Sequence, residues 1–158
     1  MPLPEAAKDY LLKALSAQPV IAGSLLGYVR HDSPVWDRRP DPSRFTLREV
    51  LAHLADWEPI WLDRCQRFVD EDHPFLPSVD ETDLVAVNDY ATSNPSDSLR
   101  AYVEGRNNLV HYLKGIPDEA WDRTADRQFV GELTLHQQVA MALSHDGYHM
   151  KQIIEWLD

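Results

Sequence analysis

The sequence predicts an all-α fold in a single domain, and three observations lead to this prediction. Four stretches repeat apolar residues at intervals of three and four, which is the spacing of an amphipathic helix. Two of them begin with a capping box, in which a threonine and a glutamate or glutamine three residues later satisfy free backbone donors. The length of 158 residues is typical of one domain and sufficient for a hydrophobic core. We therefore assign residues 1–158 to one helical domain.

The first two helices are expected near residues 4–30 and from the capping box Thr46–Glu49 onward. Pro19 is expected to kink the first helix. Pro59 is expected to bend the second, because proline donates no backbone hydrogen bond and its ring crowds the preceding turn.

The third helix is expected to start after Asn94, with Ser96 or Asp97 as its cap, and to stop at Gly115. The fourth opens on the second capping box at Thr134 and continues to the end of the chain.

The second and third helices are separated by a connection, residues 71–94, that is rich in Asp, Pro and Ser. A connection of this length is unusual in a compact helical domain, and it is typical of a lid or a partner-binding segment. We expect a short helix within it at residues 83–91.

The acidic composition argues against two classes of partner. The chain has 26 acidic and 15 basic residues and a net charge of −11. Nucleic acids and anionic membranes attract basic surfaces, so neither is expected to bind. The sequence shows no apolar run near the roughly 20 residues of a membrane span and no signal-peptide pattern. With the single cysteine, Cys65, these features lead us to expect a cytoplasmic protein.

Three histidines form the candidate site. His145 and His149 are four residues apart in the last predicted helix, so they share one face and can bind one metal ion. His53 has a similar apolar setting in the second predicted helix. Three imidazoles would leave a coordination position open, as in a catalytic zinc site. The alternative is three ordinary core histidines. His145 and His149 share an inward face of the helix with Gln152 and Ile153. Buried imidazoles need polar partners, and this need favours a metal site over ordinary core histidines.

Two segments carry a resemblance to a known family. Residues 46–58 read Thr-Leu-Arg-Glu-Val-Leu-Ala-His-Leu-Ala-Asp-Trp-Glu, and residues 145–153 read His-Asp-Gly-Tyr-His-Met-Lys-Gln-Ile. Together they resemble the signature segments of the DinB/YfiT-like superfamily, and the resemblance extends over essentially the whole chain. It implies a four-helix bundle with a long crossover between the second and third helices, commonly a homodimer.

The same resemblance implies a function. The family's metal triad falls on His53, His145 and His149, with zinc or nickel as the ion. Members with known chemistry resemble thiol-dependent transferases, so the leading hypothesis is transfer of a low-molecular-weight thiol to a small electrophile. An open position on the ion would bind the thiol and stabilise its thiolate.

Three further residues are weaker catalytic candidates. Gln152 would hydrogen-bond a small-molecule substrate or bound solvent, and Asp56 and Asp146 would orient imidazole rings.

Two alternatives remain open at this point. A metal-dependent hydrolase would use metal-bound water, but the glutamate of a His-Glu-x-x-His motif is absent, because Asp146 and Gly147 follow His145. A stress-related protein that binds metal or a small ligand without turnover is the other alternative. In that case, residues 71–94 would fill the pocket.

Overall fold

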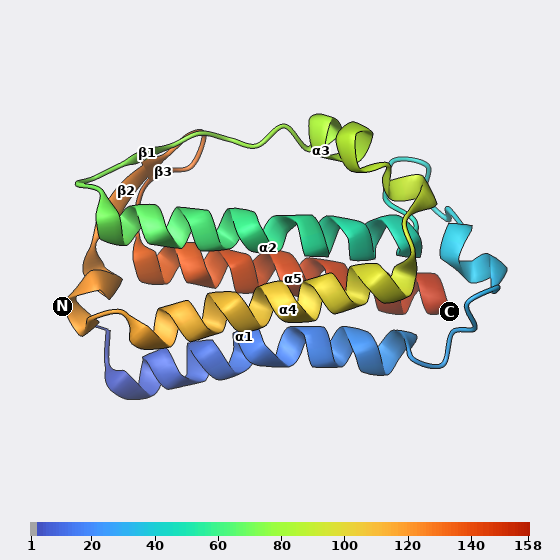
Figure 1. The fold of residues 1–158 in the computed structure, drawn as a ribbon, viewed down its shortest axis with the longest axis horizontal. Coiled ribbons are helices and arrows are strands. Elements are labelled where there is room, and N and C mark those ends of the chain that lie inside the picture. Colours follow the sequence, from blue (N-terminus) through green and yellow to red (C-terminus); the bar gives the residue numbers. More distant parts are fainter. Residues whose placement is uncertain (1–2) are drawn as a thin grey trace.

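The structure, a computed structural model, describes residues 3–158, most of which lie in four long helices (Figure 1). These are α1 (Glu5–Leu26), α2 (Leu47–Asp70), α4 (Pro95–Gly115) and α5 (Leu135–Leu157). Shorter elements are the helix α3 (Glu81–Asn88) and the 3-10 turns η1 (Pro34–Asp37), η2 (Tyr90–Thr92) and η3 (Asp118–Asp122). Across residues 3–158, no helix is both long and apolar enough to cross a membrane.

The helices form a bundle in which α1 and α5 run one way while α2 and α4 run the other (Figure 1). α2 packs against α4 and α5, and α1 packs against the same two helices. Because α2 and α4 point in the same direction, the chain must return along the length of the bundle between them. The predicted all-α four-helix bundle with a long crossover is confirmed, and this return explains the length of the connection.

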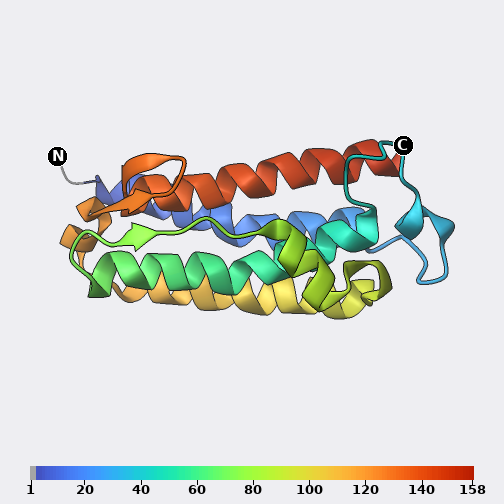
Figure 2. The same ribbon diagram turned by 90° about the horizontal axis from the view of Figure 1, so that it is seen from above.

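The crossover runs lengthwise over the side of the bundle where α2 and α5 are neighbours (Figure 2). Its helix α3 spans Glu81–Asn88, slightly earlier than the predicted residues 83–91, because the Asp80 side chain accepts a hydrogen bond from the Thr82 backbone N–H and caps the helix there. The segment therefore covers a seam between two long helices.

The helix starts follow local side-chain chemistry. Both predicted capping boxes are present, at Thr46 on α2 and Thr134 on α5. The cap of α4 is Asn94, whose side chain accepts from two backbone N–H groups, instead of the expected Ser96 or Asp97. The helix then ends at Gly115, as predicted. Pro19 and Pro59 lie inside continuous helices, so neither proline ends its helix.

A small sheet, which the sequence did not predict, closes one end of the bundle. β1 (Phe75–Leu76) pairs parallel with β2 (Thr124–Arg127), and β2 pairs antiparallel with β3 (Gly131–Thr134). Strands of two to four residues are too short to show an alternating pattern. The sheet ties the start of the crossover to the chain just before α5.

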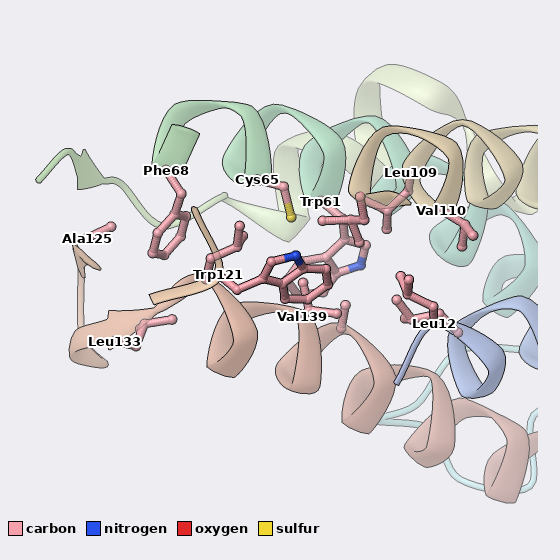
Figure 3. Close-up of a cluster of buried hydrophobic side chains, with 14 of the residues drawn as sticks. Leu12, Trp61, Cys65, Phe68, Leu109, Val110, Trp121, Ala125, Leu133 and Val139 are labelled. Carbon is pink, nitrogen blue, oxygen red and sulfur yellow. The ribbon is translucent and has the colours of Figure 1, made fainter. Parts of the chain in front are cut away.

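The core consists of two hydrophobic clusters. The first includes Trp61, Cys65, Phe68, Leu109, Trp121 and Val139 (Figure 3), and the second includes Leu47, Val50, Leu54, Tyr102, Met150, Ile153 and Trp156. On α2, α4 and α5 the clusters occupy opposite halves of each helix, and buried polar side chains lie at the level between them. Burial raises the pKa of the Cys65 thiol to about 12, so this thiol is unreactive at neutral pH.

Arg106 on α4 lies in this polar layer and contacts the other three long helices. Its guanidinium donates to both oxygens of Glu58 on α2, at 2.7 and 3.0 Å, and to Asp146 on α5 at 2.7 Å. It also donates to the Leu15 carbonyl on α1 at 2.9 Å. Burial opposes its charge, but the two carboxylates outweigh burial and raise the pKa of Arg106. This triad joins all four helices.

Gly105→Ala is expected to destabilise the fold, because α2 and α4 approach closely at this glycine. An added Cβ would lie 2.4 Å from Cβ and 2.9 Å from Cγ of Glu58, so the helices would have to separate. We expect a loss of about 1–3 kcal/mol in the free energy of unfolding, measured by urea denaturation. The control is Gly147→Ala, where an added Cβ would meet no atom within 4 Å apart from its chain neighbours and the nearby backbone of its own helix, and alanine should stabilise the helix by up to about 1 kcal/mol. Equal stabilities for the two variants would contradict the close approach.

Candidate metal centre

Three histidine side chains converge from two helices. His53 comes from α2, and His145 and His149 come from adjacent turns of α5. One ligating nitrogen from each lies within 4.8 Å of the others, and Nε2 of His53 is 2.9 Å from Nε2 of His145. The ring centroids are separated by 4.6 to 5.0 Å. The structure therefore brings together the three residues that the sequence singled out.

Burial keeps all three imidazoles neutral. Desolvation, with repulsion from His149, lowers the pKa of His53 to about 3. Desolvation and the nearby histidines and arginines lower the pKa of His145 to about 2, and desolvation lowers that of His149 to about 4. Neutral imidazole is the form that binds metal, so these rings need lose no proton at neutral pH.

Gln152 fixes the orientation of His149. Its amide nitrogen donates to the Phe45 carbonyl at 2.8 Å, so its oxygen faces Nδ1 of His149 at 3.2 Å. Nδ1 of His149 then holds the proton, and Nε2 keeps a free lone pair. Gln152 is almost completely buried, and both ends of its amide are occupied. This geometry gives Gln152 a supporting position beside His149, whereas the sequence suggested a contact with substrate.

The two aspartates proposed to orient imidazoles lie elsewhere. Asp146 is fully buried and pairs with Arg106, because it is rotated by about 100° from His145 on the helix. Asp56 accepts a hydrogen bond from Asn88 at 2.6 Å, on the side facing α3. Within residues 3–158, Nδ1 of His53 and Nδ1 of His145 have no hydrogen-bond partner. Neither aspartate orients a ring.

The histidines line a cavity of about 310 Å³. Its other lining residues are Ser43, Arg44, Phe45, Glu81, Tyr148 and Gln152. A cavity of this size at the ligating nitrogens gives a small molecule access to the site.

Arg44 and Glu81 are cavity residues that the sequence analysis missed. Arg44 lies against the rings of Trp156 and Tyr148, with its guanidinium carbon 4.6 and 5.2 Å from their centroids. Glu81 is the first residue of α3, and desolvation raises the pKa of its carboxyl. Neither has a local motif. The unusual length of the crossover was the only sequence signal near Glu81.

The three nitrogens fit a transition-metal ion. Neutral imidazoles suit zinc, nickel and related divalent ions, and three of them match the protein ligand number of a catalytic site. Two inward-facing helices hold them, an arrangement that also builds metal sites in other helical bundles. The chemistry of this donor set is therefore compatible with a bound divalent metal.

Comparison with known proteins shows the family. The family model for the DinB superfamily matches residues 29–153. The chain belongs to the DinB superfamily. In fold it is similar to a DinB-like protein, YfiT from Bacillus subtilis, described as a probable metal-dependent hydrolase with an unusual four-helix bundle topology. The TM-score is 0.83 at 22% identity, over 98% of this chain and 87% of YfiT. No functionally curated protein matches the sequence significantly.

The metal-free DinB bundle is expected to lose stability as the pH falls below about 6.5. The folded histidines have lowered pKa values, whereas in the unfolded chain they bind protons near pH 6.5, so protons favour unfolding. Each histidine should contribute up to about 1.4 kcal/mol per pH unit between pH 6.5 and pH 4. Urea denaturation at several pH values measures this slope.

The slope of the unfolding free energy against pH reports the number of protons taken up on unfolding. His53→Gln should lower that number by about one, while replacing the exposed His111 with glutamine should leave it unchanged. A wild-type slope retained by His53→Gln would contradict the burial of a neutral imidazole at this position.

Proposed function

We propose that this protein is a metal-dependent enzyme that transfers a low-molecular-weight thiol to a small electrophile. His53, His145 and His149 would hold a zinc or nickel ion. The observation that carries the proposal is the convergence of three neutral imidazoles on a cavity of about 310 Å³. A bound ion would supply a Lewis-acidic positive charge. Because the three imidazole ligands are neutral, they would not reduce that charge, which favours thiolate over thiol.

The cavity residues would position the reactants. The Gln152 side-chain oxygen holds His149 by accepting a hydrogen bond from Nδ1 of that ring. Phe45 and Tyr148 supply apolar walls that limit the access of water to the cavity. Arg44 adds positive charge beside the histidines, although its ion pair with Glu155, at 3.1 Å, moderates that charge. Such surroundings favour an anionic nucleophile.

Glu81 would act as the general base. It lines the same cavity while keeping part of its surface exposed, and partial desolvation raises the pKa of its carboxyl, which makes the carboxylate a stronger proton acceptor. It would take the proton of the incoming thiol. The sulfur would then form its bond to the electrophilic carbon as the leaving group departs.

Glu81 also supports hydrolysis as a second candidate function. The absence of a His-Glu-x-x-His glutamate argued against a hydrolase, but the crossover supplies a carboxylate to the cavity from another part of the chain. Glu81 would then take the proton of an attacking water. The similarity in fold to YfiT, described as a probable metal-dependent hydrolase, supports the same alternative.

Product analysis separates these functions. The zinc- or nickel-loaded protein would be incubated with monochlorobimane and a panel of thiols, including cysteine, glutathione and coenzyme A, in isotopically labelled water. Transfer predicts a metal-dependent thioether product, and hydrolysis predicts label from water in the product. Metal binding with neither product would favour the non-catalytic alternative and contradict both enzymatic ones.

Glu81→Gln tests the base in either reaction. We expect the rate to fall by about 100-fold to 10,000-fold with metal content unchanged. Asp83→Asn is the matched control, because Asp83 lies in the same first turn of α3 but not on the cavity. Equal rates for the two variants would remove Glu81 from the mechanism.

We propose that the protein acts in the cytoplasm, which its composition and single cysteine favour, and as a homodimer, which the family resemblance suggests. Sedimentation equilibrium of the purified chain tests the dimer, and a single species at the monomer mass of 18.1 kDa would contradict it.

A further inference from the structure

Two buried arginines near the histidines lack acidic partners. Arg64 on α2 is only 4% exposed, and Arg127 on β2 is partly buried. Among residues 3–158, no carboxylate lies within ion-pair distance of either guanidinium. Arg106 shows the contrast, because two carboxylates bracket its charge. Asp63 is the nearest acidic influence on Arg64, but it makes no ion pair with this guanidinium. Buried charges are normally paired, so two arginines without a bonded carboxylate are unusual in so acidic a chain.

Their existing contacts satisfy these arginines only in part. Arg64 donates to the Pro77 carbonyl at 3.1 Å, and Arg127 reaches the Gln138 side-chain oxygen and the Met141 sulfur, each at 3.4 Å. Burial, together with repulsion from Arg127, lowers the pKa of Arg64 to about 10 against the opposing charge of Asp63. Each guanidinium therefore stays positively charged at neutral pH without a carboxylate bonded to it.

Side chains in contact with the two arginines have unused hydrogen-bond donors. Within the part of the chain that the structure describes, four buried side-chain nitrogens here have no partner: Nη1 of Arg64, Nε1 of Trp57, Nε1 of Trp61 and Nε2 of Gln138. The Arg64 guanidinium carbon lies 5.3 Å from the Trp57 ring and 5.8 Å from the Trp61 ring, and that of Arg127 lies 5.7 Å from Trp61. All four groups donate, so the missing partner is an acceptor.

The cluster adjoins the candidate metal centre. The rings of Trp57 and Trp61 lie 5.4 and 5.7 Å from the ring of His145, so one indole separates the arginines from a histidine of the triad. Trp61 extends from α2 into the first hydrophobic cluster (Figure 3). Arg64 also borders a groove of about 300 Å³ between α2 and residues 76–79, with Asp63 and Arg67 among the other lining residues, so one side of the cluster is next to a surface groove.

The small sheet explains why the two arginines meet. Leu76 on β1 is the register partner of Arg127 on β2, and the next residue, Pro77, accepts the hydrogen bond from Arg64. The segment Leu76–Pro77 thus contacts both arginines, which are far apart in sequence, and holds them near one another.

We infer that Arg64 and Arg127 form a binding site for a carboxylate group of the substrate. The inference rests on the proposed function, since it names the substrate class of that site: small molecules that place a carboxylate beside the histidine centre. Guanidinium and indole N–H groups are donors, and a carboxylate offers only acceptors, so their chemistry is complementary. In a desolvated setting the charge-assisted bonds from guanidinium to carboxylate are strong.

Anion titration of the metal-free protein tests the site independently of catalysis. Acetate and succinate would be added at constant ionic strength, with chloride as the balancing ion. Tryptophan fluorescence and the thermal unfolding midpoint would be followed, because Trp57 and Trp61 border the site. A saturable fluorescence change and a raised midpoint are expected for carboxylates. A parallel titration with sulfate separates a carboxylate site from a general inorganic-anion site.

Three variants complete the experiment. Arg64→Met and Arg127→Met should each weaken acetate binding at least tenfold, whereas Arg100→Met should leave it unchanged, because Arg100 is exposed and pairs with Asp97. In anion-free buffer, the first two variants should unfold at or above the wild-type midpoint, because each removes a buried charge without a counter-charge. The same anion response in all three variants, no saturable response in the wild type, or a response to sulfate alone would overturn the proposal.

A separate kinetic measurement tests whether the bound carboxylate belongs to the substrate. If the metal-loaded enzyme is active, carboxylate-bearing thiols or electrophiles should have a higher kcat/KM than their amide analogues, and Arg64→Met should remove that preference. Equal kcat/KM values would overturn the assignment to substrate. Because anion binding is measured without metal, failure of the metal chemistry would leave that result standing.

Discussion

Replacing Arg106 with methionine is expected to lower the free energy of unfolding by about 3–5 kcal/mol. The substitution would leave Glu58 and Asp146 buried together without their shared cation. It would also remove the hydrogen bond to the Leu15 carbonyl, which links α4 to α1. Urea denaturation with circular dichroism measures the loss.

The control for this prediction is Arg100→Met, an exposed arginine on the same helix, which should change stability by less than about 0.5 kcal/mol. A triple variant with Arg106→Met, Glu58→Gln and Asp146→Asn should recover part of the loss, because it removes the unpaired charges together. An Arg106→Met protein as stable as Arg100→Met would contradict the structural role of the triad.

His149→Ala is expected to reduce zinc or nickel affinity by more than about 100-fold. Loss of a ligand should exceed the 10-fold to 100-fold effect typical of supporting residues, and the variant would leave only His53 and His145. Elemental analysis of untagged protein, after dialysis against a competing chelator, gives the metal content per chain. Gln152→Ala should show the smaller, supporting effect, because it removes the acceptor from Nδ1 of His149.

His136→Ala is the matched control, since His136 lies on the same helix and outside the cluster. It should retain as much metal as the wild type. Equal retention of metal by His149→Ala and His136→Ala would remove the proposed centre, while the anion site at Arg64 and Arg127 would remain open to its own test.

The sequence predicted the parts of this protein that depend on local patterns. Helical periodicity and the capping boxes at Thr46 and Thr134 located α2 and α5, because a cap involves residues only three positions apart. The four-residue spacing of His145 and His149 placed two imidazoles on one face for the same reason. Their convergence with His53 was implied by family resemblance, since spacing alone cannot bring α2 and α5 together.

The remaining features arise from contacts between distant segments. Glu81 reaches the cavity only because the crossover returns over the α2–α5 seam, and Arg127 meets Arg64 only because the short strands pair in one register. Asp146 was expected beside an imidazole, but the neighbouring helix presents Arg106 to it. By itself, the sequence determined the helices and the candidate ligands, because these follow from backbone hydrogen bonding and periodicity within one segment. The tertiary structure alone decided the partners of each buried charge, because electrostatic pairing depends on which helices become neighbours.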